Sequence, residues 1–229
     1  FLMELGLYQE AATRGQQYLA RAEGKEADYV AIGTALSRAR QFDAALAFLE
    51  SARLKFPASE NVVKALAATY LDHGQPLAAG ELMYRAALAN PALKPEAAEL
   101  FRRAKLYARA LAVNAEISDQ PVKLKQRLGI LIELGRTAEV AGMQAALMRT
   151  RLLDDEDVRY ALAYALFKEG DFAAAEGHLA KLTKPELFRK ATELRQSMQD
   201  CADERWRSAS GFLLPARGEK VGAQHPDEG

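Results

Sequence analysis

The chain has 229 residues, with 31 basic and 31 acidic side chains, so its formal charge is zero. A neutral chain creates no long-range field that favours nucleic acid or an anionic membrane, and both partners are therefore disfavoured. The single cysteine, Cys201, excludes an intrachain disulfide, and no window approaches the roughly 18 consecutive apolar residues that span a bilayer. We expect a soluble protein with no membrane span, cytoplasmic or periplasmic.

A short signature recurs along the chain: a turn residue, an aromatic residue two positions later, and alanine three positions beyond that. Its copies are Gly6/Tyr8/Ala11, Arg40/Phe42/Ala45, Gly74/Pro76/Ala79, Lys105/Tyr107/Ala110, Gly135/Thr137/Val140 and Gly170/Phe172/Ala175. Successive copies begin 34, 34, 31, 30 and 35 residues apart. A near-constant period of this length predicts a repeat architecture. The chain begins with Phe1 in place of an initiator Met, and its first residues read as the middle of a repeat, so we expect a truncated first repeat and a native N-terminus further upstream.

The segment before each later copy has the pattern of an amphipathic helix. In 28–39, the residues Tyr29, Ile32, Gly33 and Leu36 recur at steps of three and four and therefore share one helix face. The segments ENVVKALAATYLDHG and EDVRYALAYALFKEG repeat this pattern. Each unit is predicted to be a helix, a tight turn and a second helix.

This pattern resembles the tetratricopeptide repeat, a 34-residue helical hairpin, over about residues 1–185. The match is most specific in 27–57, at Tyr29, Ile32, Gly33, Leu36, Phe42, Ala45, Leu49, Ala52 and Pro57. The resemblance implies an all-α fold, an α-solenoid of stacked antiparallel helical hairpins wound as a right-handed superhelix. Later units drift from the family pattern, because Pro76 replaces the aromatic residue and Thr137 and Val140 replace the aromatic residue and alanine.

Signals for helix ends agree with these units. Ser59 is a candidate N-cap, Pro95 and Pro121 suit a first helical turn, and Thr183 with Glu186 reads as a capping box. The acidic cluster 154–157 begins the last complete unit; we interpret it as complementing a helix dipole, with a metal or partner site as the alternative.

The end of the chain is predicted to contain a helix that caps the repeat array, followed by a disordered tail. Four apolar residues at helical spacing indicate a capping helix: Leu187, Ala191, Leu194 and Met198. We therefore place the repeat array and its cap in 1–203. The segment 204–229 mixes Gly, Pro and charged residues without periodicity, and we interpret it as a disordered tail.

The sequence offers no set of residues for catalysis. The three histidines, His73, His178 and His225, have no ligand partner at i+4, and there is no second thiol. Neither a glycine-rich phosphate loop nor a nucleophile elbow occurs. We expect no enzyme activity, no metal and no cofactor.

The remaining candidate for function is the surface formed by the first helix of each unit, which is expected to line the concave side of the solenoid. The residues expected to point into this groove are Thr34, Arg38, Lys64, Asp72, Arg102, Arg103, Lys125, Tyr160, Tyr164 and Lys168. Tyr160 and Tyr164 lead, because interfaces favour tyrosine; packing against the capping helix is the alternative. The chaperone-tail clamp of some family members is not carried over, because Val30 and Thr34 stand where it uses Lys and Asn.

The resemblance implies a non-catalytic scaffold that binds a peptide or helical segment of a partner protein, or that docks through its convex face. RNA binding is a second interpretation, carried by Arg102, Arg103, Lys105, Arg109, Lys123, Lys125 and Arg127, although Glu96, Glu99 and Glu116 dilute these charges. A third is the recruiting arm of a larger enzyme. The alanine-rich, arginine-preferring composition looks bacterial.

Overall fold

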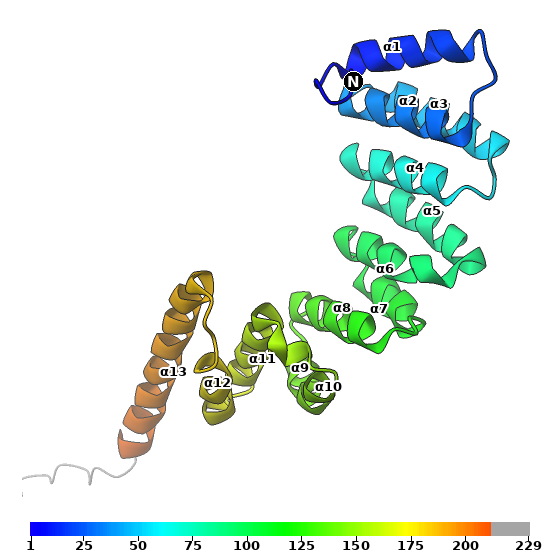
Figure 1. Ribbon diagram of the computed structural model, residues 1–229. Helices are drawn as coiled ribbons and strands as arrows, with labels where there is room; N and C mark the ends of the chain where they lie inside the picture. The colour runs from blue at the N-terminus through cyan, green and yellow to red at the C-terminus, as the bar shows by residue number, and fades with distance from the viewer. Residues whose placement is uncertain (212–229) are drawn as a thin grey trace, which may run out of the picture. The chain divides into compact units, whose positions relative to one another are not determined.

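The computed structural model describes residues 1–211, with side chains through Cys201, and this part of the chain contains helices and no strand (Figure 1). The helices are α1 Tyr8–Leu19, α2 Glu26–Arg38, α3 Phe42–Lys55, α4 Glu60–Asp72, α5 Pro76–Ala89, α6 Lys94–Arg103, α7 Tyr107–Ala115, α8 Gln120–Glu133, α9 Thr137–Gly142, α10 Gln144–Arg149, α11 Glu156–Lys168, α12 Phe172–Leu179 and α13 Pro185–Gly211, with 3₁₀ turns η1 Pro91–Leu93 and η2 Leu152–Asp154. The chain divides into two compact units, Phe1–Asp154 and a second that begins at Asp155. We describe each unit by itself.

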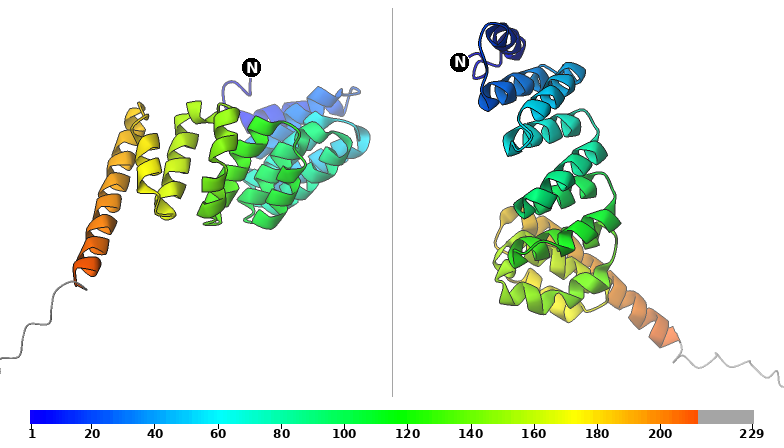
Figure 2. Two further views of the ribbon diagram at one scale, coloured as in Figure 1. Left: turned by 90° about the horizontal axis from the view of Figure 1, so that it is seen from below. Right: turned by 90° about the vertical axis from the view of Figure 1, so that its right-hand side faces the viewer.

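The first unit is a stack of antiparallel helical hairpins, as predicted for an α-solenoid (Figure 2). The hairpins are α2/α3, α4/α5, α6/α7 and α8/α9/α10, preceded by the single helix α1. The first helices also pack on one another, α2 on α4 and α6 on α8. Each hairpin therefore buries its apolar face against its neighbours in the chain.

The predicted turn residues all have a left-handed backbone. The φ angles are 74° at Gly6, 60° at Arg40, 78° at Gly74, 59° at Lys105, 69° at Gly135 and 81° at Gly170. In the hairpin α2/α3 the N–H groups of Arg40 and Gln41 donate to the carbonyls of Ser37 and Leu36, each at 2.9 Å. These two bonds close the end of the first helix and reverse the chain. One turn geometry thus serves every copy of the sequence signature.

The hairpin α2/α3 is held by close contact between small and large residues. A Cβ atom added at Gly33 would lie 2.3 Å from Leu49 Cδ2, so the two helices approach closely only because residue 33 has no side chain. Ala45 and Ala52 on α3 are fully buried. These small residues therefore let the two helices of the hairpin pack closely.

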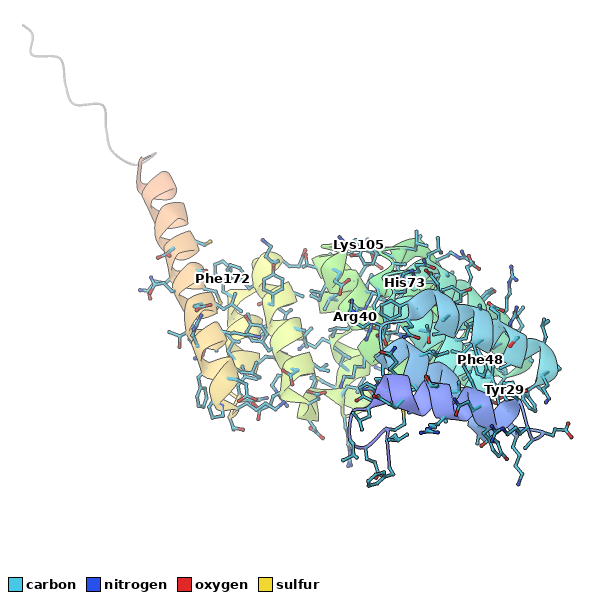
Figure 3. All side chains as sticks on the ribbon, turned by 90° about the horizontal axis from the view of Figure 1, so that it is seen from above. Tyr29, Arg40, Phe48, His73, Lys105 and Phe172 are labelled. Atoms are coloured by element: carbon cyan, nitrogen blue, oxygen red, sulfur yellow. The ribbon has the colours of Figure 1, made fainter. Side chains whose placement is uncertain are left out.

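Aromatic contacts join the ends of these hairpins (Figure 3). At one end of α2, the ring of Tyr29 stacks on Phe48 of α3 with the ring centroids 5.5 Å apart. On the turn side, Phe42 of α3 lies 5.0 Å from His73 at the end of α4, and the Arg40 guanidinium lies over the Phe42 ring. Both ends of the hairpin α2/α3 are therefore fixed by side-chain contacts.

The core of the first unit is divided into clusters. One cluster joins α1, α2 and α3 through Ala12, Ile32, Ala35, Leu36 and Ala45. A larger cluster runs from α4 to α8 and includes Phe101 and Ile130, both fully buried. Burial of these apolar faces is what drives one hairpin to stack on the next.

A glutamate begins the first helix of two hairpins and accepts a hydrogen bond from an asparagine that follows in the chain. Glu26 Oε1 accepts a hydrogen bond from Asn61 Nδ2 at 2.8 Å, and Glu60 Oε1 accepts one from Asn90 Nδ2 at 2.5 Å. Helix caps agree with the sequence, since the Ser59 side chain accepts from the Val62 N–H. Pro95 and Pro121 lie in the first turns of α6 and α8, as predicted.

The second unit contains the hairpin α11/α12 and the helix α13, which packs on both. The apolar stripe predicted for a capping helix is buried at Leu187, Ala191, Leu194 and Met198. Helix α13 continues to Gly211, past the boundary expected at 203, because 204–210 contains no Pro or Gly that would end it. The other residues of the predicted tail, 212–229, lie outside the described part of the chain.

The capping box predicted at Thr183 and Glu186 is wrong. The Thr183 hydroxyl and N–H both donate to Glu156, the first residue of α11, and α13 begins only at Pro185. Glu156 also accepts from the Lys184 N–H at 2.8 Å, and Asp157 pairs with the Lys184 ammonium at 2.7 Å. The acidic cluster therefore joins the start of α11 to the start of α13.

Candidate functional site

Two adjoining hollows lie on the first helices of the first unit. The hollow between α2 and α4 has a volume of about 440 Å³ and is lined by Glu26, Ala27, Val30, Ala31, Thr34, Asn61, Lys64 and Ala65. The hollow between α4 and α6 has a volume of about 320 Å³ and is lined by Lys64, Ala67, Ala68, Leu71, Met83, Glu96, Glu99 and Leu100. Lys64 lines both, so we treat them as one feature, the first-helix groove.

The floor of the first-helix groove is made of small apolar side chains. Ala31 of α2 and Ala65 and Ala68 of α4 leave space that larger residues would fill. Their spacing follows the helix, because residues three and four apart lie on the same face. A surface of this kind can receive bulky apolar side chains from a partner.

Charged groups border this floor. The Lys64 ammonium lies between the hollows and is 4.0 Å from Glu60, in a half-exposed pair that is weak in water. The hydrogen bond from Asn61 is the main reason why the pKa of Glu26 is lowered, with Ser59 contributing less. The charge of Lys64 is therefore less committed to a contact within the protein than that of Glu26.

At the other end, Glu99 is held by two arginines of its own helix. Arg102 Nη2 lies 2.7 Å and Arg103 Nε 2.9 Å from Glu99 Oε1, and Arg102 also bonds to Glu133 of α8. The hydrogen bond from Arg102 is the largest cause of the lowered pKa of Glu99, and burial opposes it. Arg102 thus joins α6 to α8, whereas Arg103 pairs with Glu99 within α6.

The structure brings some of the predicted contact residues together. Thr34 and Lys64 both line the groove. Arg38 and Asp72 are exposed at the ends of α2 and α4, outside the lining of the two hollows. Lys125 is exposed on α8.

The other three predicted residues lie on α11 in the second unit. Tyr160 is half-buried, and the Lys190 ammonium of α13 lies 5.8 Å from the centre of its ring. Burial is the main cause of the raised pKa of Tyr160, followed by the charge of Glu193 and by Tyr164. Tyr164 is also half-buried and Lys168 is exposed. Tyr160 therefore contacts the capping helix, which was the alternative to a free contact surface.

Sequence reasoning missed the alanines that form the groove floor. The residues predicted to line the groove are polar, charged or aromatic, whereas the groove exists because Ala31, Ala65 and Ala68 are small. The signal was present as small residues on the face of α2 and α4 that does not pack on the second helix of the hairpin. Charged residues are more conspicuous in the sequence, but three of those predicted to line the groove form ion pairs within the protein: Lys64, Arg102 and Arg103.

The cations proposed for RNA binding are mostly matched by carboxylates. Arg102 and Arg103 pair with Glu99, Arg109 pairs with Glu81, and Arg127 lies 3.8 Å from Glu139. Among the side chains that the structure describes, no group of three or more His, Cys, Asp or Glu residues could hold a metal ion. No helix of this part of the chain is long and apolar enough to span a bilayer.

The chain was compared with known proteins. No protein-family model and no curated protein matches it. A tetratricopeptide repeat protein from Parabacteroides merdae superposes with a TM-score of 0.59 at 16% identity, covering 93% of this chain and 87% of its own. Pseudomonas aeruginosa PilF gives a TM-score of 0.55 at 16% identity, covering 82% of this chain and 89% of its own. YrrB, described as a tetratricopeptide repeat protein with an unusual peptide-binding site, gives 0.54 at 15% identity, covering 85% of this chain and 99% of its own. At these identities the likeness establishes the fold alone.

Proposed function

Since the chain has the tetratricopeptide-repeat fold, we propose that it is a non-catalytic scaffold that binds a segment of a partner protein in the first-helix groove. The observation that carries this proposal is the pair of alanine-floored hollows on either side of Lys64. The existence of a related fold with a peptide-binding site, in YrrB, supports the same kind of function.

The groove also indicates what the bound segment contains. Each hollow can take one bulky apolar side chain, because Ala31, Ala65 and Ala68 leave space above the helix backbones. Lys64 stands between the hollows, and its ammonium group can pair with a carboxylate. The expected ligand is therefore a peptide in which an acidic residue lies between two large apolar residues.

The predicted contact residues take different parts in this proposal. Thr34 and Lys64 contact the segment directly. The remaining residues of the first unit contact a longer segment that continues past the hollows: Arg38, Asp72, Arg102, Arg103 and Lys125. Tyr160, Tyr164 and Lys168 form a separate contact surface on the second unit.

Selection from a displayed random-peptide library tests the first-helix groove. The wild-type chain is expected to select peptides with the apolar, acidic, apolar pattern, and Ala68→Trp is expected to lose them because the indole fills the second hollow. Ala47→Trp is the matched control, since Ala47 is exposed on α3 and lines neither hollow. Selected peptides that bind Ala68→Trp and Ala47→Trp equally well would contradict the proposed site.

A second experiment addresses the tyrosines. Replacement of Tyr160 and Tyr164 by alanine is expected to weaken capture of a partner while the melting temperature changes little. An equal loss of thermal stability would mean that these rings serve only to hold α13, as the contact between Lys190 and Tyr160 suggests.

A further inference from the structure

A separate groove lies between the second helices of two hairpins. It has a volume of about 370 Å³ between α3 and α5, and Val63 of α4 lies at its floor. The walls are formed by Arg53 and Leu54 of α3 and by Leu82 and Arg85 of α5. None of these residues lines the first-helix groove, so this second-helix groove is a distinct surface.

Exposed leucine marks this surface. Leu54 is 81% exposed beside the groove, whereas Ala45, Leu49 and Ala52 of the same helix are buried. Leu88, 34 residues later, has the same place on α5 and is 67% exposed. Single exposed leucines are common on proteins, but recurrence at the repeat spacing next to a hollow is typical of an interaction surface.

The charges at the groove have one sign. Arg53 and Arg85 line it and no carboxylate does. Arg53 lies in the last turn of α3, where a cation also complements the helix dipole, and it bonds to Glu50 at 3.0 Å. Arg85 is not in the last turn of α5, and its charge acts on Glu81, one helical turn earlier, which itself pairs with Arg109. Helix capping therefore does not account for the position of Arg85, and the acidic group nearest to it in the helix is shared with Arg109.

We infer that the second-helix groove docks an acidic amphipathic segment of a partner protein. A leucine-type side chain of the segment fills the hollow beside Leu54, and its carboxylates meet the guanidinium groups of Arg85 and Arg53. The lining contains no aromatic residue on which a nucleic-acid base could stack, and its floor is apolar. An acidic peptide matches both properties. The inference goes beyond the proposed function and does not depend on it.

Fluorescence anisotropy with two labelled peptides tests this inference. The first peptide combines leucines with aspartates and glutamates, and the second has lysine in place of each acid. The acidic peptide is expected to bind the wild-type chain and to lose affinity by about tenfold or more in the double variant Arg53→Glu, Arg85→Glu. The basic peptide is expected to bind the double variant better than the wild-type chain. Leu54→Ser should weaken the acidic peptide by several fold.

Two controls make the result specific to the groove. The double variant Arg21→Glu, Arg149→Glu changes the net charge equally at exposed positions elsewhere, and it should retain the affinity for the acidic peptide. Ala68→Trp should also retain it, because Ala68 belongs to the first-helix groove. Circular dichroism of each variant establishes that the helices remain folded.

Three results would overturn the inference: no binding of the acidic peptide to the wild-type chain, equal loss in both charge-reversed variants, or loss in Ala68→Trp with none in the Arg53, Arg85 variant. The last result would place the acidic peptide in the first-helix groove. Failure of the library selection on that groove would leave the anisotropy result unaffected, so the two proposals fail independently.

Discussion

The hairpins of the first unit fall into two classes that hold their helices together by different contacts. The regular hairpins are α2/α3 and α4/α5, and the shortened hairpins are α6/α7 and α8/α9/α10. The turns of the regular hairpins are 34 residues apart, and those of the shortened ones follow after 31 and 30. In the regular class, close contact of small and large apolar residues holds the two helices together, as at Gly33 and Leu49. In the shortened class, α7 has nine residues and the second helix of the last hairpin is interrupted at Met143.

Polar side chains replace the missing helical length. Asn114 is fully buried, and its Nδ2 donates to the Lys123 carbonyl at 3.0 Å and to Gln126 Oε1 at 3.1 Å. Gln126 in turn donates to the Pro95 carbonyl at 2.8 Å. The comparison teaches that a repeat can lose residues from its second helix when a buried amide connects its end to the next hairpin.

The largest effect is expected from filling the close contact of a regular hairpin. Gly33→Leu should lower the free energy of unfolding by about 3 kcal/mol, because its side chain would occupy the position of Leu49. Gly129→Leu in α8 is the matched change in a shortened hairpin, where nothing lies within 4 Å of the added Cβ. It should change stability by less than about 1 kcal/mol. Urea denaturation measures both, and similar losses would remove the distinction between the two classes.

A smaller loss is expected from removing the buried amide of a shortened hairpin. Asn114→Ala should cost about 1 to 2 kcal/mol, because two acceptors lose their donor and a space remains. Asn61→Ala removes an exposed hydrogen bond to Glu26 between regular hairpins and should cost less than about 0.5 kcal/mol. If Asn61→Ala cost as much as Asn114→Ala, polar bonding would be equally important in both classes.

The turn is the feature that both classes share, and here a gain is expected. Arg40→Gly and Lys105→Gly should each raise stability by up to about 1 kcal/mol, because φ is 60° and 59° at these residues and glycine adopts such angles without strain. Thermal melts of the two variants measure the gain. A loss at Arg40 alone would show that its contact with the Phe42 ring outweighs the backbone strain.

The second unit extends the comparison through a buried histidine, with the smallest expected effect. Burial is the main cause of the lowered pKa of His178, and the charges of Arg159 and Lys181 lower this pKa further. The unfolded chain therefore takes up a proton at higher pH than the folded chain, so stability should fall as the pH drops below about 6.5 and level off below the folded pKa. Melting temperatures between pH 7 and 5 should show this fall in the wild-type chain and much less of it in His178→Leu. An identical pH dependence in both would assign it to other groups.

The fold could be predicted from the sequence because its determinants are local and repeated. Turn residues such as Gly74 and helix signals such as Ser59 act on a few neighbouring residues, so their spacing revealed each hairpin. Contacts that join hairpins could not be predicted in the same way. The bonds from Thr183 to Glu156 and from Arg102 to Glu133 depend on the packing of helices that are distant in sequence. The first-helix groove was harder to predict than these bonds, because it exists only where the small side chains of alanine leave space between packed helices.

Because the core of the first unit is divided into separate apolar clusters, a destabilising substitution in one cluster should act first on the helices of that cluster. Ala12, Ile32 and Leu36 share one cluster and Phe101 and Ile130 another, so a lesion among the first three residues loosens the N-terminal helices before it reaches α6. Amide hydrogen exchange would then rise in α1 to α3 while α6 to α8 stay protected. Such a molecule can unfold locally in its N-terminal helices while the helices that follow remain folded.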